Sequence, residues 1–337
     1  MPEVDAAAER ALTYAALAPG DPAPWFRQAS TSNPDYAFDS VAGRYVVLCF
    51  LGSAADSLAR AAIGAVFAQR ARFDDESLCF FGVSVDRGDQ ARLKESLPGL
   101  RYFWDFDLKV SRLYGAAPRE GETGTRVALR RMWLVLDPML RILQIFPLER
   151  HDALFAYLAQ LPPPAEFAGF EIQAPILILP RVFEPEFCRH LIELYERNGG
   201  TASGVMQEAD GKTVSVENRD FKVRKDYIIS DDGLMQQLRG RIVRRVVPEI
   251  QRIHQFKATR MERYLVACYA AEDGGHFAPH RDNTTKGTAH RRFAVSVNLN
   301  DSFDGGGVSF PEYGPRGYKP PAGGAVVFSC AMLHAVA

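Results

Sequence analysis

The sequence predicts two domains, an α/β domain followed by a mainly β domain with supporting helices. Three observations support this prediction. The chain has 337 residues, more than a typical single domain, so two separate cores are expected. Its first half alternates strand, helix and strand patterns, which are typical of parallel α/β units. Its last third contains short β-rich runs separated by Gly and Pro, which are typical of an antiparallel sandwich or barrel.

The first half presents its elements in the order that an α/β domain requires. The apolar run YVVLCFL predicts a buried strand, and apolar residues at helical spacing follow it. A second apolar run, LCFFGVSVD, comes after this helix, so the two strands are expected to lie parallel. The predicted elements are a strand at 45–51, a helix within 52–73, a strand at 78–86, a hairpin at 132–147 around Asp137-Pro138, and a helix at 151–161.

A triple proline, Pro162-Pro163-Pro164, marks the predicted boundary between the domains, because it ends the preceding helix and favours a stiff, extended segment. The predicted division is an N-terminal extension at 1–17, a first domain at 18–161, a linker at 162–173 and a second domain at 174–337.

The second domain starts with a predicted strand and helix over 175–200. Pro185 stands near the start of this helix, and Gly199-Gly200 follow its end, as is usual for helix termini. A further helix is predicted from Asp231 to Ile253, kinked at Pro248. The β-rich runs that follow are RYLVACY, RRFAVSVNLN, GGVSFPEY and GAVVFSCAML.

Composition excludes several classes of protein. A net charge of -1 gives no support to a nucleic-acid reader. The N-terminus carries early acids without a continuous apolar stretch, and no window reaches the ~18 apolar residues of a membrane span, so no signal peptide, anchor or membrane contact is expected. The cysteines are scattered without a CxxC pair, which predicts reduced thiols and a cytoplasmic protein. They are Cys49, Cys79, Cys188, Cys268 and Cys330.

The stretch GGHFAPHRDN contains a candidate metal site. On a strand, residues two apart point the same way, so His280 and Asp282 can offer an imidazole and a carboxylate to one ion. Two histidines and one carboxylate form the facial triad of non-haem Fe(II) oxygenases. His334, after the apolar run at 324–333, is the candidate for the third ligand. A His-x-Asp tripeptide by itself is more typical of a surface pair. Its assignment as a metal site therefore depends on the surrounding sequence.

That surrounding sequence resembles the prolyl 4-hydroxylase-like branch of the Fe(II)- and 2-oxoglutarate-dependent dioxygenases, over about residues 174–337. The resemblance rests on LVACYAAEDGGHFAPHRDN, VSVNLNDSFDGGGVSFPEYG, PPAGGAVVFS and the closing LHAV, which come in the family's order. It implies a double-stranded β-helix, or jelly roll, that binds iron through His280, Asp282 and His334.

The resemblance also implies cofactors and pocket residues. Tyr269 matches a tyrosine that bonds the cosubstrate carboxylate, Phe277 an aromatic residue lining the pocket, and Asn298 a further cosubstrate position. The implied chemistry is oxidative decarboxylation of 2-oxoglutarate to succinate, coupled to hydroxylation of an unactivated carbon by O2, with ascorbate as an accessory reductant.

The sequence departs from the family at one point. The family carries an arginine or lysine on the strand after the distal histidine, where it pairs with the far carboxylate of 2-oxoglutarate, but the given sequence stops at Ala337. We expect a chain truncated before its last strand. The alternatives are an impaired site or a substitute basic residue such as Arg263, Arg291 or Arg292.

The remaining histidines are expected to play no part in metal binding. His276 is predicted to be solvated or to lie behind the ligands, and His290 belongs to a basic cluster. His151, His190 and His254 fall on predicted helices or their ends.

The first domain resembles a peroxiredoxin of the thioredoxin superfamily, over about residues 18–160. The resemblance rests on GDPAPWF, GRYVVLCFLGSAADS, FFGVSVD and MWLVLDPMLRILQIFP. Peroxide reduction needs a low-pKa cysteine at the start of the helix after the first core strand. This segment reads GSAADSLAR, and serines cannot replace the thiolate. The domain is therefore interpreted as a non-peroxidatic redoxin scaffold for binding, assembly or substrate presentation, or as plain support for the second domain.

Three functions follow from the sequence. The first is an Fe(II)- and 2-oxoglutarate-dependent hydroxylase acting on a protein, peptide or small molecule, with a prolyl residue as the best-known target of its family. The second is a redox-linked binding or sensor protein whose oxygenase site is weak or inactive. The third is an atypical thiol peroxidase using Cys49 or Cys79. A homo-oligomer is one of the quaternary structures that the sequence allows. Fold and family do not by themselves fix the substrate.

Overall fold

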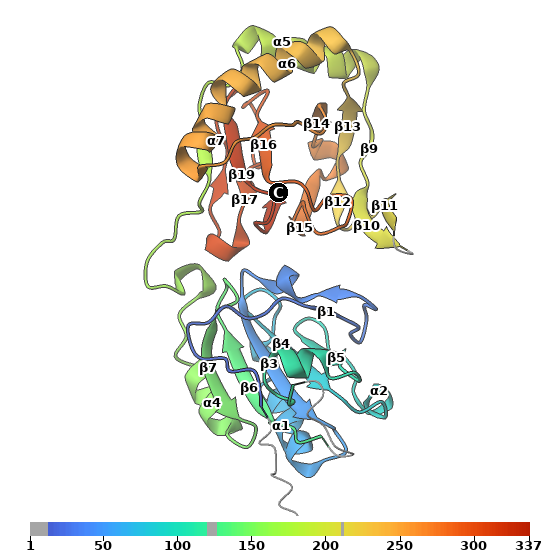
Figure 1. The fold of residues 1–337 in the computed structure, drawn as a ribbon, viewed down its shortest axis with the longest axis vertical. Coiled ribbons are helices and arrows are strands. Elements are labelled where there is room, and N and C mark those ends of the chain that lie inside the picture. Colours follow the sequence, from blue (N-terminus) through green and yellow to red (C-terminus); the bar gives the residue numbers. More distant parts are fainter. Residues whose placement is uncertain (1–12, 120–126, 210–211) are drawn as a thin grey trace, which may run out of the picture. The chain divides into compact units, whose positions relative to one another are not determined.

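The computed structural model describes residues 13–119, 127–209 and 212–337. The chain divides into two compact units, Met1–Glu171 and Ile172–Ala337, and the division falls inside the predicted linker. Pro164–Glu166 in that linker forms a single 3-10 turn. Each unit has its own sheets and its own core (Figure 1).

The first unit is built on a five-stranded sheet in the order β5-β4-β3-β6-β7. Its first three strands in that order run parallel, and β6 and β7 are antiparallel to their neighbours. The strands are β3 (Tyr45–Gly52), β4 (Leu78–Ser84), β5 (Leu100–Trp104), β6 (Met132–Leu136) and β7 (Ile142–Pro147); a separate small sheet pairs β1 (Arg27–Gln28) with β2 (Tyr36–Ala37). This is a thioredoxin-like arrangement, as the sequence predicts.

Layers of side chains cover both faces of this sheet. Alternate residues of β3 point to opposite faces, so Val47 and Phe50 enter different cores. Helices α1 and α4 pack on the first face, and aromatic rings that include Phe26 and Phe38 pack on the second. The helices are α1 (Ser57–Ala68), α2 (Asp89–Arg92), α3 (Lys109–Leu113) and α4 (His151–Leu158).

The second unit contains two layers of strands with helices on the outside (Figure 1). One layer is the five-stranded sheet β12-β15-β20-β17-β18. The other consists of two three-stranded sheets, β14-β13-β9 and β16-β19-β8. The bounds of the first layer are β12 (Lys222–Val223), β15 (His276–His280), β17 (Val308–Ser309), β18 (Gly317–Tyr318) and β20 (His334–Val336).

The strands of the second layer are β8 (Leu177–Leu179), β9 (Thr201–Ala202), β13 (Lys225–Ile228), β14 (Leu265–Cys268), β16 (Phe293–Val297) and β19 (Ala325–Ser329); β10 (Val205–Ala209) and β11 (Lys212–Val216) form a hairpin of their own. The two layers form the double-stranded β-helix that the resemblance implies. The predicted β-rich runs are confirmed as β14, β16, β17 and β19.

Strand β19 shows how this unit separates its two cores. Val327 packs with the helices, whereas Val326 and Phe328 pack toward the other sheet with Phe310. This alternation follows from the two-residue period of a strand, and it leaves the space between the layers for the candidate site. The helices on the outer side are α5 (Pro185–Asn198), α6 (Asp232–Arg245) and α7 (Val247–His254).

The predicted kink at Pro248 is a break between two helices. Helix α6 ends at Arg245, and α7 begins at Val247 with the proline in its first turn. A proline in the first turn loses no helical hydrogen bond, because that N–H has no partner within the helix. The short helix α7 can therefore turn so that Ile250 reaches the core.

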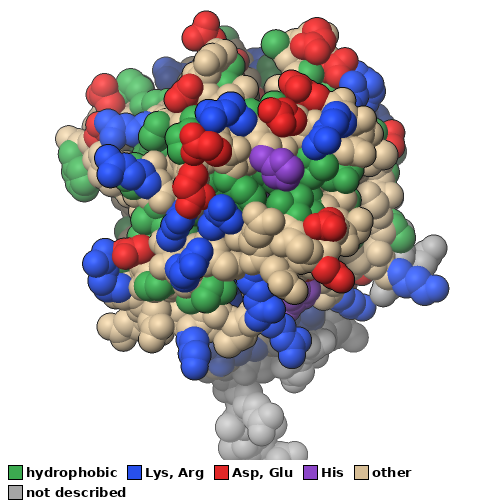
Figure 2. Space-filling model, turned by 90° about the horizontal axis from the view of Figure 1, so that it is seen from above, with side chains coloured by type: hydrophobic (Ala, Val, Ile, Leu, Met, Phe, Trp, Pro, Cys, Tyr) green, Lys and Arg blue, Asp and Glu red, His purple; other side chains and the backbone are tan. Residues whose placement is uncertain are grey.

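One side of the second unit carries mixed charge. Figure 2 looks onto its helix-bearing side and shows Lys and Arg side chains interspersed with Asp and Glu side chains. Among the helices of the described ranges, none has both the length and the apolar character that a bilayer span needs.

Candidate metal centre

His280, Asp282 and His334 come together between the two layers of strands. Their potential ligand atoms all lie within 4.8 Å of one another. Asp282 Oδ1 is 3.6 Å from His280 Nε2, and Asp282 Oδ2 is 3.7 Å from His334 Nε2. The two histidines face each other across the antiparallel pair β15 and β20, which explains how a distant segment supplies the third ligand. This donor set fits the facial triad of non-haem Fe(II).

Both imidazoles are oriented for metal binding. His280 Nδ1 donates to the Ala278 carbonyl at 2.8 Å, and His334 Nδ1 donates to the Met332 carbonyl at 3.0 Å. Since a carbonyl can only accept, the proton belongs on Nδ1 in each ring. The Nε2 lone pair is then left for a metal, which is the usual arrangement of histidine ligands.

The protonation states at neutral pH also suit a cation. Burial opposes ionisation of Asp282, but its polar contact with His280 and the nearby charge of His334 outweigh burial and lower its pKa to about 2. Burial, followed by repulsion from His280, lowers the pKa of His334 to about 4. A carboxylate and a neutral imidazole are the forms in which these side chains bind metals.

A buried ion pair ties the two ligand strands together. Arg281 points away from the trio, and its guanidinium meets both oxygens of Glu312 at 2.9 and 3.1 Å. Glu312 Oε2 also accepts the backbone N–H of Leu333 at 2.9 Å, directly before His334. Arg281 further donates to the carbonyl of Ala331. The pair thus fixes the backbone beside all three ligands, a role typical of residues behind a metal site.

One of the three predicted pocket residues contacts the trio directly. Phe277 stacks on His280, with ring centroids 3.4 Å apart. Tyr269 follows β14, is partly buried, and its hydroxyl lies 3.4 Å from Arg224 Nη1. Asn298 is placed elsewhere, because its amide donates to the Pro320 carbonyl at 2.8 Å and stabilises the connection before β19. The structure does not bring Asn298 to the metal ligands.

Of the substitute basic residues named from the sequence, Arg291 lies beside the trio, where its Nη1 donates to the Asp282 carbonyl at 3.3 Å. The guanidinium of Arg291 binds both oxygens of Glu262, at 2.6 and 2.5 Å, so its charge is already neutralised. Arg263 and Arg292 are exposed. Two further basic side chains lie beside Phe277, the buried Lys222 and the mostly buried Arg224, and Arg224 also lies beside Tyr269.

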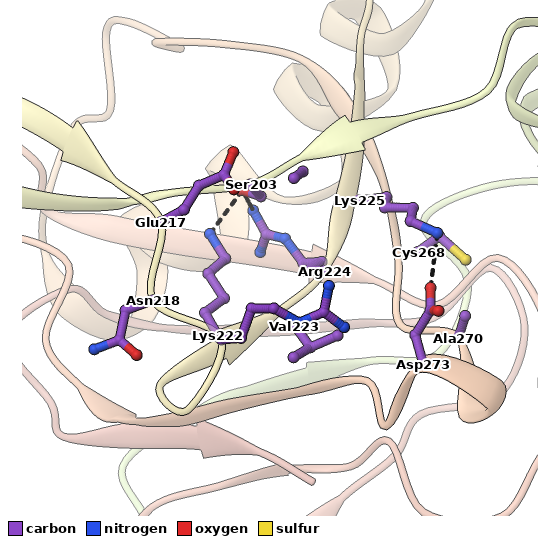
Figure 3. A pocket seen from close by; sticks show the side chains of 12 residues that line it. Ser203, Glu217, Asn218, Lys222, Val223, Arg224, Lys225, Cys268, Ala270 and Asp273 are labelled. Carbon is purple, nitrogen blue, oxygen red and sulfur yellow. Dashed lines mark hydrogen bonds and ion pairs between the residues drawn. The ribbon is translucent and has the colours of Figure 1, made fainter.

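Sequence reasoning missed this basic pair, which lines a cavity of about 90 Å³ (Figure 3). A signal was present in KVRKD at 222–226, where charged residues recur with the two-residue period of a strand. Such a run normally indicates a solvated face. Here Lys222 and Asp226 are buried and the Arg224 side chain is only 14% exposed, and burial cannot be read from charge spacing.

The other histidines do not join the trio. His276 Nδ1 donates to the Gly274 carbonyl at 2.8 Å, and His290 lies 3.3 Å from Glu262. His151, His190 and His254 lie in α4, α5 and α7.

The first unit has no thiol at the position that peroxide chemistry needs. The start of α1 is capped by Asp56, which accepts N–H groups of Leu58 and Ala59 and pairs with Arg131 at 2.6 Å. Cys49 and Cys79 are buried within β3 and β4. Burial raises the pKa of Cys79 to about 12 and that of Cys49 well above its usual value, so both thiols are protonated and packed.

Solved structures similar to this chain match about two fifths of its length. The peroxidoxin BcpB from Mycobacterium tuberculosis is 18% identical, with 44% of this chain and 99% of that chain covered and a TM-score of 0.36. The thiol peroxidase from Chromobacterium violaceum is 15% identical, with 44% and 90% covered and a TM-score of 0.34. The 2-Cys peroxiredoxin from Plasmodium vivax is 17% identical, with 42% and 98% covered and a TM-score of 0.32. Sequence identities and TM-scores this low say nothing about the activity of this chain.

The C-terminal part of the chain matches a family model. The 2OG-Fe(II) oxygenase superfamily matches residues 264–337, a range that contains all three members of the trio. This family uses Fe(II), 2-oxoglutarate and O2. The residues present fit the metal, because they supply two imidazoles with free Nε2 atoms and one ionised carboxylate. The C-terminal unit therefore carries a 2OG-Fe(II) oxygenase domain, and the protein is a dioxygenase.

Proposed function

We propose that the protein is an Fe(II)- and 2-oxoglutarate-dependent hydroxylase that acts on a C–H bond of a prolyl residue in a protein or peptide. The observation that carries the proposal is the meeting of His280, Asp282 and His334 within 4.8 Å. Bound iron would supply the oxidation chemistry, with 2-oxoglutarate and O2 as cosubstrates and ascorbate as an accessory reductant. The prolyl substrate rests on the sequence resemblance described above.

The chain's own residues have separate tasks in this proposal. The trio holds the metal and leaves coordination positions open. Phe277 covers the His280 ring and limits access of water to it. The Arg281–Glu312 pair holds both ligand strands in position. Tyr269, whose hydroxyl lies 3.4 Å from Arg224 Nη1, is proposed to bind the cosubstrate carboxylate, as the sequence resemblance implies.

The redoxin-like unit is proposed to be a binding or assembly module. Its fully buried thiols and its Asp56-capped helix favour this role over thiol peroxidase chemistry. The second candidate function is a sensor protein with a weak oxygenase site. Measured turnover distinguishes this sensor from the proposed hydroxylase. The free cysteines support a reducing compartment such as the cytoplasm, and the mixed surface charge supports a partner other than nucleic acid.

An anaerobic titration tests the proposed function. Purified protein is titrated with Fe(II) and then with 2-oxoglutarate, and the metal-to-ligand charge-transfer absorption is followed. We expect a band in the wild type that is absent in His280→Ala. His276→Ala is the matched control, since this imidazole lies on the same strand and bonds the Gly274 carbonyl instead of joining the trio. A wild type without a band would overturn the proposal. A band without succinate release on any prolyl peptide would favour the sensor alternative.

A further inference from the structure

The guanidinium of Arg291 connects a metal ligand to a carboxylate from a distant segment. Its Nε and Nη2 donate to the two oxygens of Glu262 at 2.6 and 2.5 Å, and its Nη1 donates to the backbone carbonyl of Asp282 at 3.3 Å. The side chain of Arg291 is only 16% exposed. Glu262 lies just before β14, so the guanidinium joins this segment to the residue that supplies the carboxylate ligand.

Asp282 is held by its backbone, whereas the two histidine ligands are held by their rings. His280 and His334 each donate Nδ1–H to a carbonyl. The Asp282 carboxylate faces the Nε2 atoms of these rings, at 3.6 and 3.7 Å, which leaves its oxygens for a metal. The direction of the carboxylate therefore depends on the peptide groups on either side of Asp282.

Hydrogen bonds fix the Asp282 backbone at both of these peptide groups. Its N–H donates to the carbonyl of Cys330 at 2.9 Å, and the N–H of Cys330 donates to the carbonyl of Arg292 at 3.0 Å. The Asp282 carbonyl accepts from the Arg291 side chain. Because Arg291 and Arg292 are consecutive, these contacts close a ring that includes the backbones of Asp282 and Cys330. Loss of the Arg291 contact opens this ring at the metal ligand.

The loop between Asp282 and Arg291 supports the same contact. Thr285 and Thr288 are buried, and Thr288 Oγ1 accepts the Thr285 N–H at 3.1 Å. The carbonyl of Thr288 accepts the N–H of Arg291 at 2.9 Å. This compact turn returns the chain toward its start, so the Arg291 side chain can reach back to the Asp282 carbonyl.

The contacts of Arg291 depend on the shape of a guanidinium group. This group is planar and carries N–H donors in fixed directions, so it can bind both oxygens of one carboxylate and still donate to a third acceptor. A lysine ammonium is a point charge without this fork. Since Glu262 neutralises the charge of Arg291, the contact with Asp282 acts mainly through geometry.

We propose that Arg291, held by Glu262, is a positioning residue that fixes the Asp282 carboxylate in the orientation that metal binding requires. The inference rests on the proposed function only in that the trio binds a metal, and it does not depend on the substrate. Residues that support a metal ligand from behind typically change metal affinity about 10- to 100-fold when they are replaced.

Metal binding to the full chain tests the inference without turnover. Mn(II) affinity is measured by calorimetric titration, and the absorption bands of bound Co(II) report the geometry of its ligands. We expect Arg291→Met and Glu262→Gln to bind Mn(II) about 10- to 100-fold more weakly and to shift the Co(II) bands. Arg291→Lys should be as weak as Arg291→Met, because lysine keeps the charge and loses the fork. Glu249→Gln is the matched control, since Glu249 pairs with the exposed Arg252 on α7.

Two results would overturn the inference. One is wild-type Mn(II) affinity in either Arg291→Met or Glu262→Gln. The other is wild-type affinity in Arg291→Lys, because charge alone would then be sufficient. Glu262 is an exposed residue, so Glu262→Gln is expected to keep the fold and tests the inference even where Arg291→Met fails to fold.

Failure of the proposed function remains distinguishable from failure of this inference. If the wild type binds neither Mn(II) nor Co(II), the proposed function fails, and hydrogen exchange of the metal-free protein tests the positioning. The Asp282 N–H is bonded to the Cys330 carbonyl, so its exchange reports local opening of the ring. Faster exchange at Asp282 in Glu262→Gln, with no change in Glu249→Gln, supports the inference. Equal exchange in Glu262→Gln and wild type overturns it.

Discussion

The Phe277 ring lies flat on the imidazole of His280, with centroids 3.4 Å apart and planes inclined by 16°. The same ring meets the Lys222 ammonium at 4.5 Å. One aromatic side chain thus contacts both a metal ligand and a buried ammonium group. Its position is fixed by the pairing of β15 with β12, in which Phe277 lies opposite Lys222.

Removing this ring is expected to loosen the metal ligand. Phe277→Ala takes away the surface that holds the His280 ring and opens the site to water, so metal affinity should fall about 10-fold, as for other supports of metal ligands. Calorimetric titration with Mn(II) measures the change without turnover. Phe256→Ala is the control, because this partly exposed ring packs on Phe293 instead. Equal affinities of Phe277→Ala and wild type would contradict the prediction.

The Arg281–Glu312 pair is expected to contribute to stability as well as to the site. Glu312→Gln leaves the buried Arg281 charge without its counter-ion, and breaking a buried pair from one side costs about 3–5 kcal/mol. We expect the free energy of unfolding of the second unit in urea to fall by about this amount. Glu186→Gln, in an exposed pair with Arg189, should leave the urea midpoint nearly unchanged. A comparable shift of the urea midpoint in both variants would show that burial of the Arg281–Glu312 pair does not set its contribution to stability.

Lys222 is expected to make stability depend on pH. Burial, and then the charge of Arg224, lower its pKa from 10.5 to about 8, with Arg263 acting in the same sense and Asp226 and Asp282 opposing. Between about pH 8 and 10.5 the unfolded chain binds more protons than the folded one, so this group makes stability rise with pH. Below pH 8 its buried charge costs up to about 3 kcal/mol.

Lys222→Met should therefore be more stable than the wild type at pH 7, and its advantage should shrink as the pH rises from 8 toward 10.5. Urea unfolding of metal-free protein at several pH values measures the difference. Lys225→Met should show no such trend, because Lys225 is exposed. A constant difference between Lys222→Met and wild type across this range would mean that Lys222 titrates normally.

The thiols of the first unit are expected to be unreactive in the native state. Cys49 and Cys79 are buried and have raised pKa values, so iodoacetamide at pH 7.5 should label the partly exposed Cys268 first and reach the two strand cysteines only in denaturant. Mass spectrometry of digested protein gives the order of labelling. Rapid native labelling of Cys49, together with iron-independent peroxide consumption, would restore the thiol peroxidase hypothesis.

The sequence by itself determined the elements with strong periodicity. The apolar runs of β3, β4 and β19 are long enough to be identified as buried strands, and the proline and glycines around α5 mark its ends. The sequence also indicated metal binding by the motif around His280 and Asp282, because their spacing on a strand puts both side chains on one side.

Short strands escaped prediction, since two or three residues show no measurable period. Strands β9, β12, β18 and β20 are of this kind. Asn298 was assigned to the pocket by likeness, but its amide is used by the backbone at Pro320.

Only the tertiary structure decided which charges are buried and what they meet. KVRKD reads as a solvated stretch, yet pairing of β12 with β15 brings Lys222 against Phe277, and pairing of β15 with β20 brings His280 opposite His334. These contacts join residues far apart in the chain. The free energy of a buried charge depends on its neighbours in space, so local sequence specified the metal ligands, while the fold placed a buried cation beside the ring that stacks on one of them.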